Sequence, residues 1–272
     1  MQERIETHEF LPLAEHLQVG QSVRAKHCNN NRTMIVSRGQ GKVTAHCFRC
    51  DGRGFHAEQE NFQDKLNRIA AERNAEHVAV ASHTLPEPRV YDLKLWPRDA
   101  ALWLYKSGFS PSMIDRLGAY WCPDLGRVVL PIMEDGHAVF WQARAIERKP
   151  KIILPKRRRD GLVAKYGQGD TLVLCEDILS AFKVGQVTEA WSLLGTVLLP
   201  HPMAEILYRG CRVVVWLDSD TPGQKAAHKI IRTLRAHGVD VTNVVTEHDP
   251  KMYDRAFIQE KLCLSSTSMT TQ

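Results

Sequence analysis

The sequence predicts a chain of two folded parts: a small β-rich metal-binding module, then a larger α/β domain built on a parallel sheet. Two observations lead to this fold class. Three of the seven cysteines, Cys28, Cys47 and Cys50, lie close together near the start of the chain. From residue 170 onward, short apolar runs alternate with segments of helical periodicity, a pattern typical of parallel sheets. The 272 residues are enough for two compact domains joined by a linker.

Residues 1–56 are predicted to form the small module. The segment RTMIVSRGQGKVTAHCFRC indicates a short strand, a glycine-containing turn at 38–42, and a second strand that ends on a cysteine pair. The spacing of that pair, Cys47-x2-Cys50, resembles a zinc ribbon, and Cys28 supplies a third sulfur.

A fourth ligand is needed to close a tetrahedral zinc site, and His27 is our first choice although it neighbours Cys28 in the chain. We favour structural zinc over three unrelated core thiols, because a module with so few apolar residues needs a cross-link. The alternative fourth ligands are His46 and His56.

Residues 57–97 are predicted to be a helix and a linker. Apolar residues recur with helical spacing as far as about residue 75. Residues 77–97 contain three prolines and show no period, which indicates a linker.

Residues 98–165 are predicted to be a basic subdomain. Two short helices are expected, in RDAALWLYKSG and in SPSMIDRLG, with Ser110 as the N-cap before Pro111. The segment GRVVLPIMEDGHAVFWQARAI predicts a hairpin with EDG at its turn.

The α/β domain is predicted for residues 166–260. Its strands are expected in TLVLC, AWSLLG, RVVVWL and VDVTNVV, with helices between them. Residues 261–272 are expected to be a disordered tail.

Acidic residues follow three of these strands. Glu176 and Asp177 come after TLVLC, Asp218 and Asp220 after RVVVWL, and Asp249 after VDVTNVV. In open α/β sheets, ligands gather at the carboxyl ends of the strands. Clustered carboxylates suit hard divalent cations such as Mg²⁺ or Mn²⁺, so the sequence predicts a cation site at this edge.

The alternative is that these acids cap the helices that follow them. Asp177 fits this alternative best. For Asp218 and Asp220 together we favour metal binding, because a cap needs only one carboxylate. Asp249 taken alone fits either interpretation.

The segments LVLCEDILSAFKVG, SLLGT, VVVWLDSDTPGQKAA and HDPKMYD, in this order over about residues 165–255, resemble the Toprim domain. That domain is shared by DnaG-type primases, topoisomerases and related nucleases. The resemblance implies that four acids are catalytic and bind Mg²⁺ or Mn²⁺. They are Glu176, Asp218, Asp220 and Asp249. The last segment departs from the family pattern, with histidine where a lysine often precedes the aspartate.

A zinc ribbon ahead of a Toprim domain resembles the layout of DnaG-type primases, and the basic segment between the two parts resembles their N-terminal subdomain. This resemblance implies that Arg127, Arg144 and Lys151 contact nucleotide phosphates or template. The run that starts with Lys156 and Arg157 adds a positive patch, with a solvated turn as the alternative. Phosphate contacts of this kind give salt-dependent affinity without sequence preference.

The resemblance implies a phage DNA primase that makes short RNA primers on single-stranded DNA from ribonucleoside triphosphates by two-metal nucleotidyl transfer. The sequence shows no phosphate loop of the form Gly-x4-Gly-Lys-Ser/Thr, so the expected replicative helicase partner is a separate chain. Two alternatives stay open: a Toprim-type metal-dependent DNA nuclease, and a non-catalytic nucleic-acid-binding protein that assists a helicase.

Composition agrees with a nucleic-acid partner but does not require one. The net charge is +5. The start of the chain lacks a signal peptide, no apolar run is long enough for a membrane span, and the cysteine count is odd. We therefore expect a cytoplasmic protein without a membrane partner, in the host cytoplasm if the gene is phage-encoded.

Overall fold

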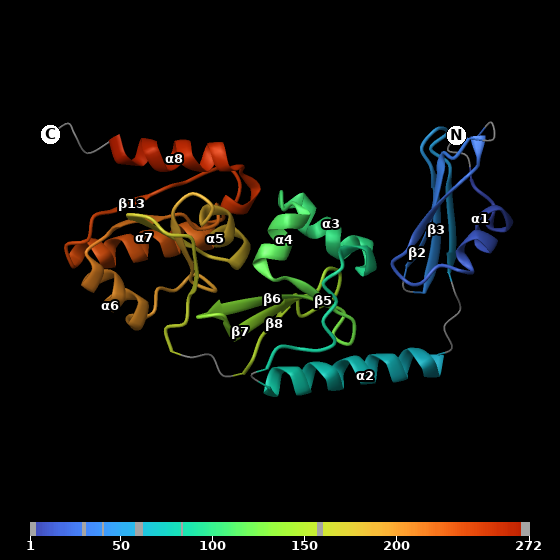
Figure 1. Cartoon of the computed structure of the whole chain (residues 1–272), viewed down its shortest axis with the longest axis horizontal. Helices are drawn as coiled ribbons and strands as arrows, with labels where there is room; N and C mark the ends of the chain where they lie inside the picture. Colours follow the sequence, from blue (N-terminus) through green and yellow to red (C-terminus); the bar gives the residue numbers. More distant parts are fainter. Residues whose placement is uncertain are drawn as a thin grey trace. The chain divides into compact units, whose positions relative to one another are not determined.

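The computed structural model describes residues 4–28, 31–39, 41–57, 62–82, 84–156 and 160–267. These residues form three β-sheets, with strand orders β1-β2-β3-β4, β5-β6-β7-β8 and β13-β12-β10-β11-β9 (Figure 1). The chain divides into two compact units: the first holds 1–103, 119–129 and 142–153, and the second holds the rest. No helix in the described ranges has the length and apolar character needed to cross a membrane.

The N-terminal module is an antiparallel sheet with one helix against it. The sequence predicted only the two central strands, and the structure adds a strand at each edge and the helix α1. Phe10 and Ala14 of α1 are buried against apolar strand residues such as Val36. The elements are α1 (Thr7–Ala14), β1 (Ser22–Ala25), β2 (Met34–Gly39), β3 (Lys42–Cys47) and β4 (Arg53–Ala57).

Helix α2 (Phe62–Ala81) is longer than predicted, so the expectation of a linker from residue 77 is wrong. The polar contacts of its C-terminal half explain the extension. Glu76 accepts hydrogen bonds from Arg127, and Glu72 accepts one from Arg148. Burial alone would raise the pKa of Glu76, but these two arginines lower it.

The predicted helices and hairpin of the basic subdomain are present. Ser110 caps its helix by accepting a hydrogen bond from the Met113 amide. The hairpin turn lies at Asp135 and Gly136, both with positive φ, as a two-residue turn requires. The elements are the short helix η2 (Leu93–Leu95), α3 (Arg98–Lys106), α4 (Pro111–Leu117), β5 (Tyr120–Cys122), β6 (Arg127–Glu134), β7 (His137–Arg144) and β8 (Ile152–Ile153).

The C-terminal part is the predicted α/β domain. Its sheet is parallel through β13, β12, β10 and β11, and β9 adds an antiparallel edge that the sequence did not indicate. The strands are β9 (Ala164–Tyr166), β10 (Thr171–Cys175), β11 (Glu189–Ser192), β12 (Arg212–Val215) and β13 (Val241–Asn243).

Helices cover both faces of this sheet (Figure 1). Side chains of α6 and α7 pack against Leu172 and Leu174 on one face, and those of α5 and α8 pack near Val173 and Cys175 on the other. This explains why the strands read as continuous apolar runs. The helices are α5 (Ile178–Val184), α6 (Pro200–Arg209), α7 (Thr221–Ala236), the short helix η3 (Pro250–Met252) and α8 (Arg255–Thr267).

The expected disordered tail at 261–272 is wrong for its first part. Helix α8 continues to Thr267, and Ile258 within it is fully buried in the core. The last five positions of that expectation lie outside the described residues.

The ion pair between Arg127 and Glu76 gives a stability prediction. We expect Arg127→Met to lower the free energy of unfolding by about 3 kcal/mol, because Glu76 loses a buried partner. The measurement is urea unfolding followed by circular dichroism. The matched control is Arg89→Met, whose pair with Glu87 is more exposed, with an expected loss below about 1 kcal/mol. Equal losses in the two variants would contradict this role.

Candidate active site and metal centre

The order of the parallel strands creates a site at their carboxyl ends. From β10 the chain passes to β11 on one side, and it later returns to place β12 on the other side. Strand order therefore reverses between β10 and β12, where open α/β sheets bind their ligands. Glu176 follows β10 and Asp218 follows β12, so both carboxylates belong to this reversal point.

Glu176 is held through its backbone. Its carbonyl oxygen accepts hydrogen bonds from the Gly195 amide at 3.0 Å and from the Ser192 hydroxyl at 3.2 Å. Burial raises the pKa of its carboxyl group, and the charges of Asp177 and Asp220 raise it further.

Asp218 is the most strongly perturbed acid of the site. Its Oδ1 atom is buried and has no hydrogen-bond partner in the described part of the chain. Burial is the main reason why the pKa of Asp218 rises to about 7; Lys251 lowers it, and Asp177, Asp249 and Glu176 raise it. An unsatisfied carboxylate oxygen of this kind suits a ligand of a divalent cation.

Asp220 is the N-cap of α7. Its Oδ1 accepts a hydrogen bond from the Gly223 amide at 2.8 Å. Gly223 allows this close approach, because a Cβ atom there would come within 2.4 Å of the Asp218 carbonyl oxygen. Asp220 is therefore a capping residue, whereas Asp218 has an unsatisfied oxygen. Metal binding by both stays a prediction.

Asp177 is the N-cap of α5, as the sequence indicated. Its Oδ1 accepts a hydrogen bond from the Ser180 amide, and its Oδ2 accepts one from the Ser180 hydroxyl. The Oδ2 atom also accepts a hydrogen bond from Lys251 at 2.8 Å, which the sequence did not indicate.

Lys251 is the site residue that sequence reasoning missed. Its ammonium group donates to Asp177 and to Asp249 at 2.8 and 2.7 Å, and it lies 4.0 Å from Asp218 Oδ2. Burial alone would lower its pKa, but these carboxylates outweigh burial and raise it. Its position after Pro250, within HDPKMYD, was the available signal, since this segment ends at the same edge of the sheet.

Three of the acids, Asp177, Asp218 and Asp249, lie around this ammonium group, and the acids do not form a tight set of metal ligands in the described residues. In the described ranges, one group of metal-binding side chains has all its ligand atoms within 4.8 Å of one another, and it lies in the N-terminal module. The predicted acids do lie at one edge of the sheet, since the charge of Asp249 raises the pKa of both Glu176 and Asp218.

The N-terminal group consists of His27, Cys28, Cys47 and Cys50. The Sγ atoms of Cys28 and Cys47 are 3.8 Å apart, and His27 Nδ1 lies 3.3 and 3.7 Å from the sulfurs of Cys28 and Cys50. Zinc–sulfur bonds of about 2.3 Å place the sulfurs of a tetrahedral site about 3.8 Å apart. The four side chains thus fit the predicted zinc ion, with His27 as the fourth ligand.

The electrostatics of this group favour a bound cation. Burial raises the pKa of Cys47, but hydrogen bonds from the Thr33 hydroxyl and from backbone amides lower it to about 5. The thiolate is the form that binds metal. Glu9 Oε2 lies 3.7 Å from Nε2 of His27, on the side away from the sulfurs. His46, one of the alternative zinc ligands, instead forms a hydrogen bond with the Asp51 carboxylate.

The predicted phosphate-binding residues differ in their availability. Arg127 is fully buried, and it donates to Glu76 and to the carbonyl oxygens of Pro150 and Lys151, so its prediction as a phosphate contact does not fit this structure. Arg144 lies over the ring of Trp103 at 4.9 Å.

The two lysines predicted as phosphate or template contacts are exposed. Lys151 and Lys156 have exposed side chains, so both are accessible to a polyanion. Their role in binding stays a prediction. The predicted contact Arg157 lies outside the described residues.

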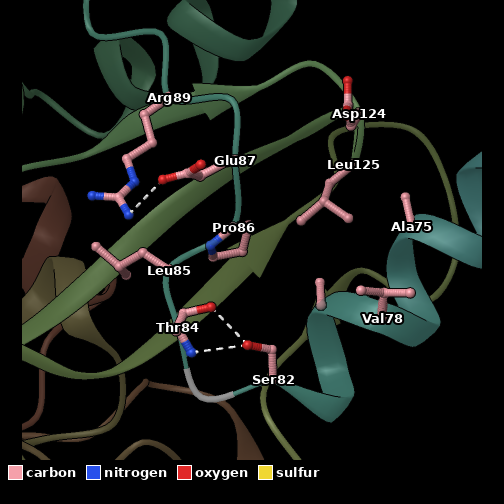
Figure 2. A pocket seen from close by; sticks show the side chains of 11 residues that line it. Ala75, Val78, Ser82, Thr84, Leu85, Pro86, Glu87, Arg89, Asp124 and Leu125 are labelled. Carbon is pink, nitrogen blue, oxygen red and sulfur yellow. Dashed lines mark hydrogen bonds and ion pairs between the residues drawn. The ribbon is translucent and has the colours of Figure 1, made fainter.

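A hollow of about 560 Å³ lies beside the C-terminal half of α2 (Figure 2). Apolar side chains such as Val78 and Leu125 line it, together with the ion pair between Arg89 and Glu87. We call Glu176, Asp177, Asp218, Asp220 and Asp249 the acid edge, and His27, Cys28, Cys47 and Cys50 the cysteine group. None of the residues that line the hollow belongs to either, so we assign it no part in the chemistry.

Comparison with known proteins agrees with this description. Residues 173–245 match the Toprim domain family. The structure is similar to the zinc-binding and RNA polymerase domains of the Aquifex aeolicus primase, with a TM-score of 0.53, 17% identity, and coverage of 97% of this chain and 83% of that chain. No curated protein matches the chain in sequence.

A second solved structure is similar over a shorter part of the chain. The RNA polymerase domain of the Mycobacterium tuberculosis primase DnaG aligns with a TM-score of 0.51 and 13% identity, over 73% of this chain and 83% of that chain. The chain therefore carries a Toprim domain within a fold like that of DnaG-type primases, and the predicted fold class is confirmed.

The cysteine group gives the first prediction for this site. We expect Cys50→Ser to lose its bound zinc, because three ligands hold the ion far less tightly than four. The measurement is zinc content by mass spectrometry of metals after gel filtration. The control is Cys263→Ser, an exposed cysteine outside the group, which should retain about one zinc per chain. Full zinc in both variants would contradict the assignment.

The raised pKa of Asp218 gives the second prediction. The folded chain keeps this proton up to about pH 7, above the ordinary pKa of 3.8, so the free energy of unfolding falls as pH rises between these values. We therefore expect Asp218→Asn to raise the melting temperature by about 5 °C at pH 8 and by far less at pH 4.5. The comparison requires a buffer free of Mg²⁺ and Mn²⁺.

The control for this measurement is Asp170→Asn, an exposed acid at the opposite end of β10. It should change the melting temperature equally at both pH values. A pH-independent effect of Asp218→Asn would show that its carboxyl group has an ordinary pKa.

Proposed function

We propose that this chain is a DNA primase that makes short RNA primers on single-stranded DNA from ribonucleoside triphosphates. The observation that carries the proposal is the acid edge at the strand reversal of a Toprim domain, on a chain that also holds the Cys₃His group. The likeness to a primase over 97% of this chain supports it, because the likeness includes both parts.

The acids that would hold Mg²⁺ or Mn²⁺ are Glu176, Asp218, Asp220 and Asp249. Their fit rests on the oxygen ligands that these ions prefer and on the unsatisfied Oδ1 atom of Asp218. When bound, such a cation lowers the pKa of the attacking 3′-hydroxyl and offsets negative charge on the triphosphate.

The remaining residues bind and orient the substrates. The exposed lysines Lys151 and Lys156 supply positive charge for template or triphosphate, and the guanidinium of Arg144 is oriented by its position over Trp103. The zinc-binding module would help to recognise the template. We place the activity in phage DNA replication, with a replicative helicase as partner.

Primer synthesis tests the proposal. The protein is incubated with single-stranded DNA of mixed sequence, labelled ribonucleotides, and Mg²⁺ or Mn²⁺. We expect short labelled RNA from the wild type and a loss of at least about 100-fold in the double variant Asp218→Asn/Asp220→Asn. Asparagine retains the cap of α7 but not the charge, so a loss of activity is not a loss of the helix.

Asp170→Asn is the matched control and should retain activity. Metal-dependent shortening of the DNA without RNA product would instead indicate the nuclease. Neither product nor cleavage, including after addition of a replicative helicase, would indicate an accessory protein that binds nucleic acid.

A further inference from the structure

The ammonium group of Lys251 lies where three carboxylates of the acid edge converge. It donates hydrogen bonds to Asp177 and Asp249 and is 4.0 Å from Asp218 Oδ2. A two-metal phosphoryl-transfer site needs two cations about 3.5–4 Å apart among such carboxylates. Here a cation that belongs to the protein already occupies part of that space.

Three carboxylate oxygens of Asp177 and Asp249 already accept hydrogen bonds. Both oxygens of Asp177 accept hydrogen bonds, one from the Ser180 amide and the other from Ser180 Oγ and Lys251. Oδ2 of Asp249 accepts from Lys251. Oδ1 of Asp218 is buried and has no hydrogen-bond partner in the described residues, and it belongs to the carboxylate farthest from the ammonium group among the three.

The backbone fixes Lys251 in this place. The short helix η3 carries it directly after the buried Pro250, and the lysine side chain is 20% exposed. Two charge-assisted hydrogen bonds hold the ammonium group. A hydrated Mg²⁺ sheds water reluctantly, so it competes poorly for oxygens held in this way.

We propose that Lys251 takes the place of one of two divalent cations, so that the acid edge binds a single Mg²⁺ or Mn²⁺ through Asp218 and its neighbours Glu176 and Asp220. The inference rests on the proposed function and modifies it. One divalent cation acts on the substrates, and a fixed monovalent charge beside it offsets part of the charge on the triphosphate.

The test counts bound Mn²⁺, separately from catalysis. Zinc-loaded protein is titrated with Mn²⁺, and free Mn²⁺ is measured from its electron paramagnetic resonance signal. We expect one Mn²⁺ per chain for the wild type and none for Asp218→Asn/Asp220→Asn. We expect two for Lys251→Met, which has a similar length but no charge, and one for Lys251→Arg, which restores the charge.

The matched control is Lys165→Met. Lys165 also donates to a carboxylate, that of Glu205, away from the acid edge, so this variant should bind one ion. Two ions bound by the wild type, or one bound by Lys251→Met, would overturn the role of Lys251 and leave the proposed function standing. No ion bound by the wild type would be a different result, since it would also remove the cation on which the proposed function depends.

Discussion

Repulsion among like charges at the carboxyl ends of the parallel strands is the constraint on which the rest of this structure depends. The sheet brings Glu176 and Asp218 to one edge because their strands are neighbours. The protein relieves the repulsion in three ways. Lys251 supplies a positive charge, the first turns of α5 and α7 supply amide donors to Asp177 and Asp220, and Asp218 keeps its proton to a higher pH.

The two predicted metal sites differ in the chemistry of their side chains and in the structure that carries them. Thiolates and an imidazole in the N-terminal module select a soft or borderline ion, and they connect strands that enclose only a small core. The carboxylates belong to a domain whose sheet is buried on both faces, so we expect that domain to fold without an ion. In our proposal, metal in the first site stabilises structure, whereas metal in the second acts on substrates.

Periodicity and local signals predicted the α/β domain, the hairpin and the Ser110 cap, because each depends on residues close together in the chain. The sequence missed α1, which is short and contains Pro12, and the edge strands β1 and β4, which are only four and five residues long. It also missed the contacts of Lys251 with Asp177 and of Arg127 with Glu76. These pairs are 74 and 51 residues apart, a separation over which no local pattern operates.

The N-cap at the start of α7 narrows which residues this loop can accept. Cation binding at position 220 would need only a carboxylate, which glutamate also provides. Capping of α7 favours the shorter side chain of aspartate. Position 223 must lack a Cβ atom because the loop folds back onto the Asp218 carbonyl. Asp220 and Gly223 are thus interdependent choices, so grafting the two acids onto another strand–helix junction would fail unless the glycine came with them.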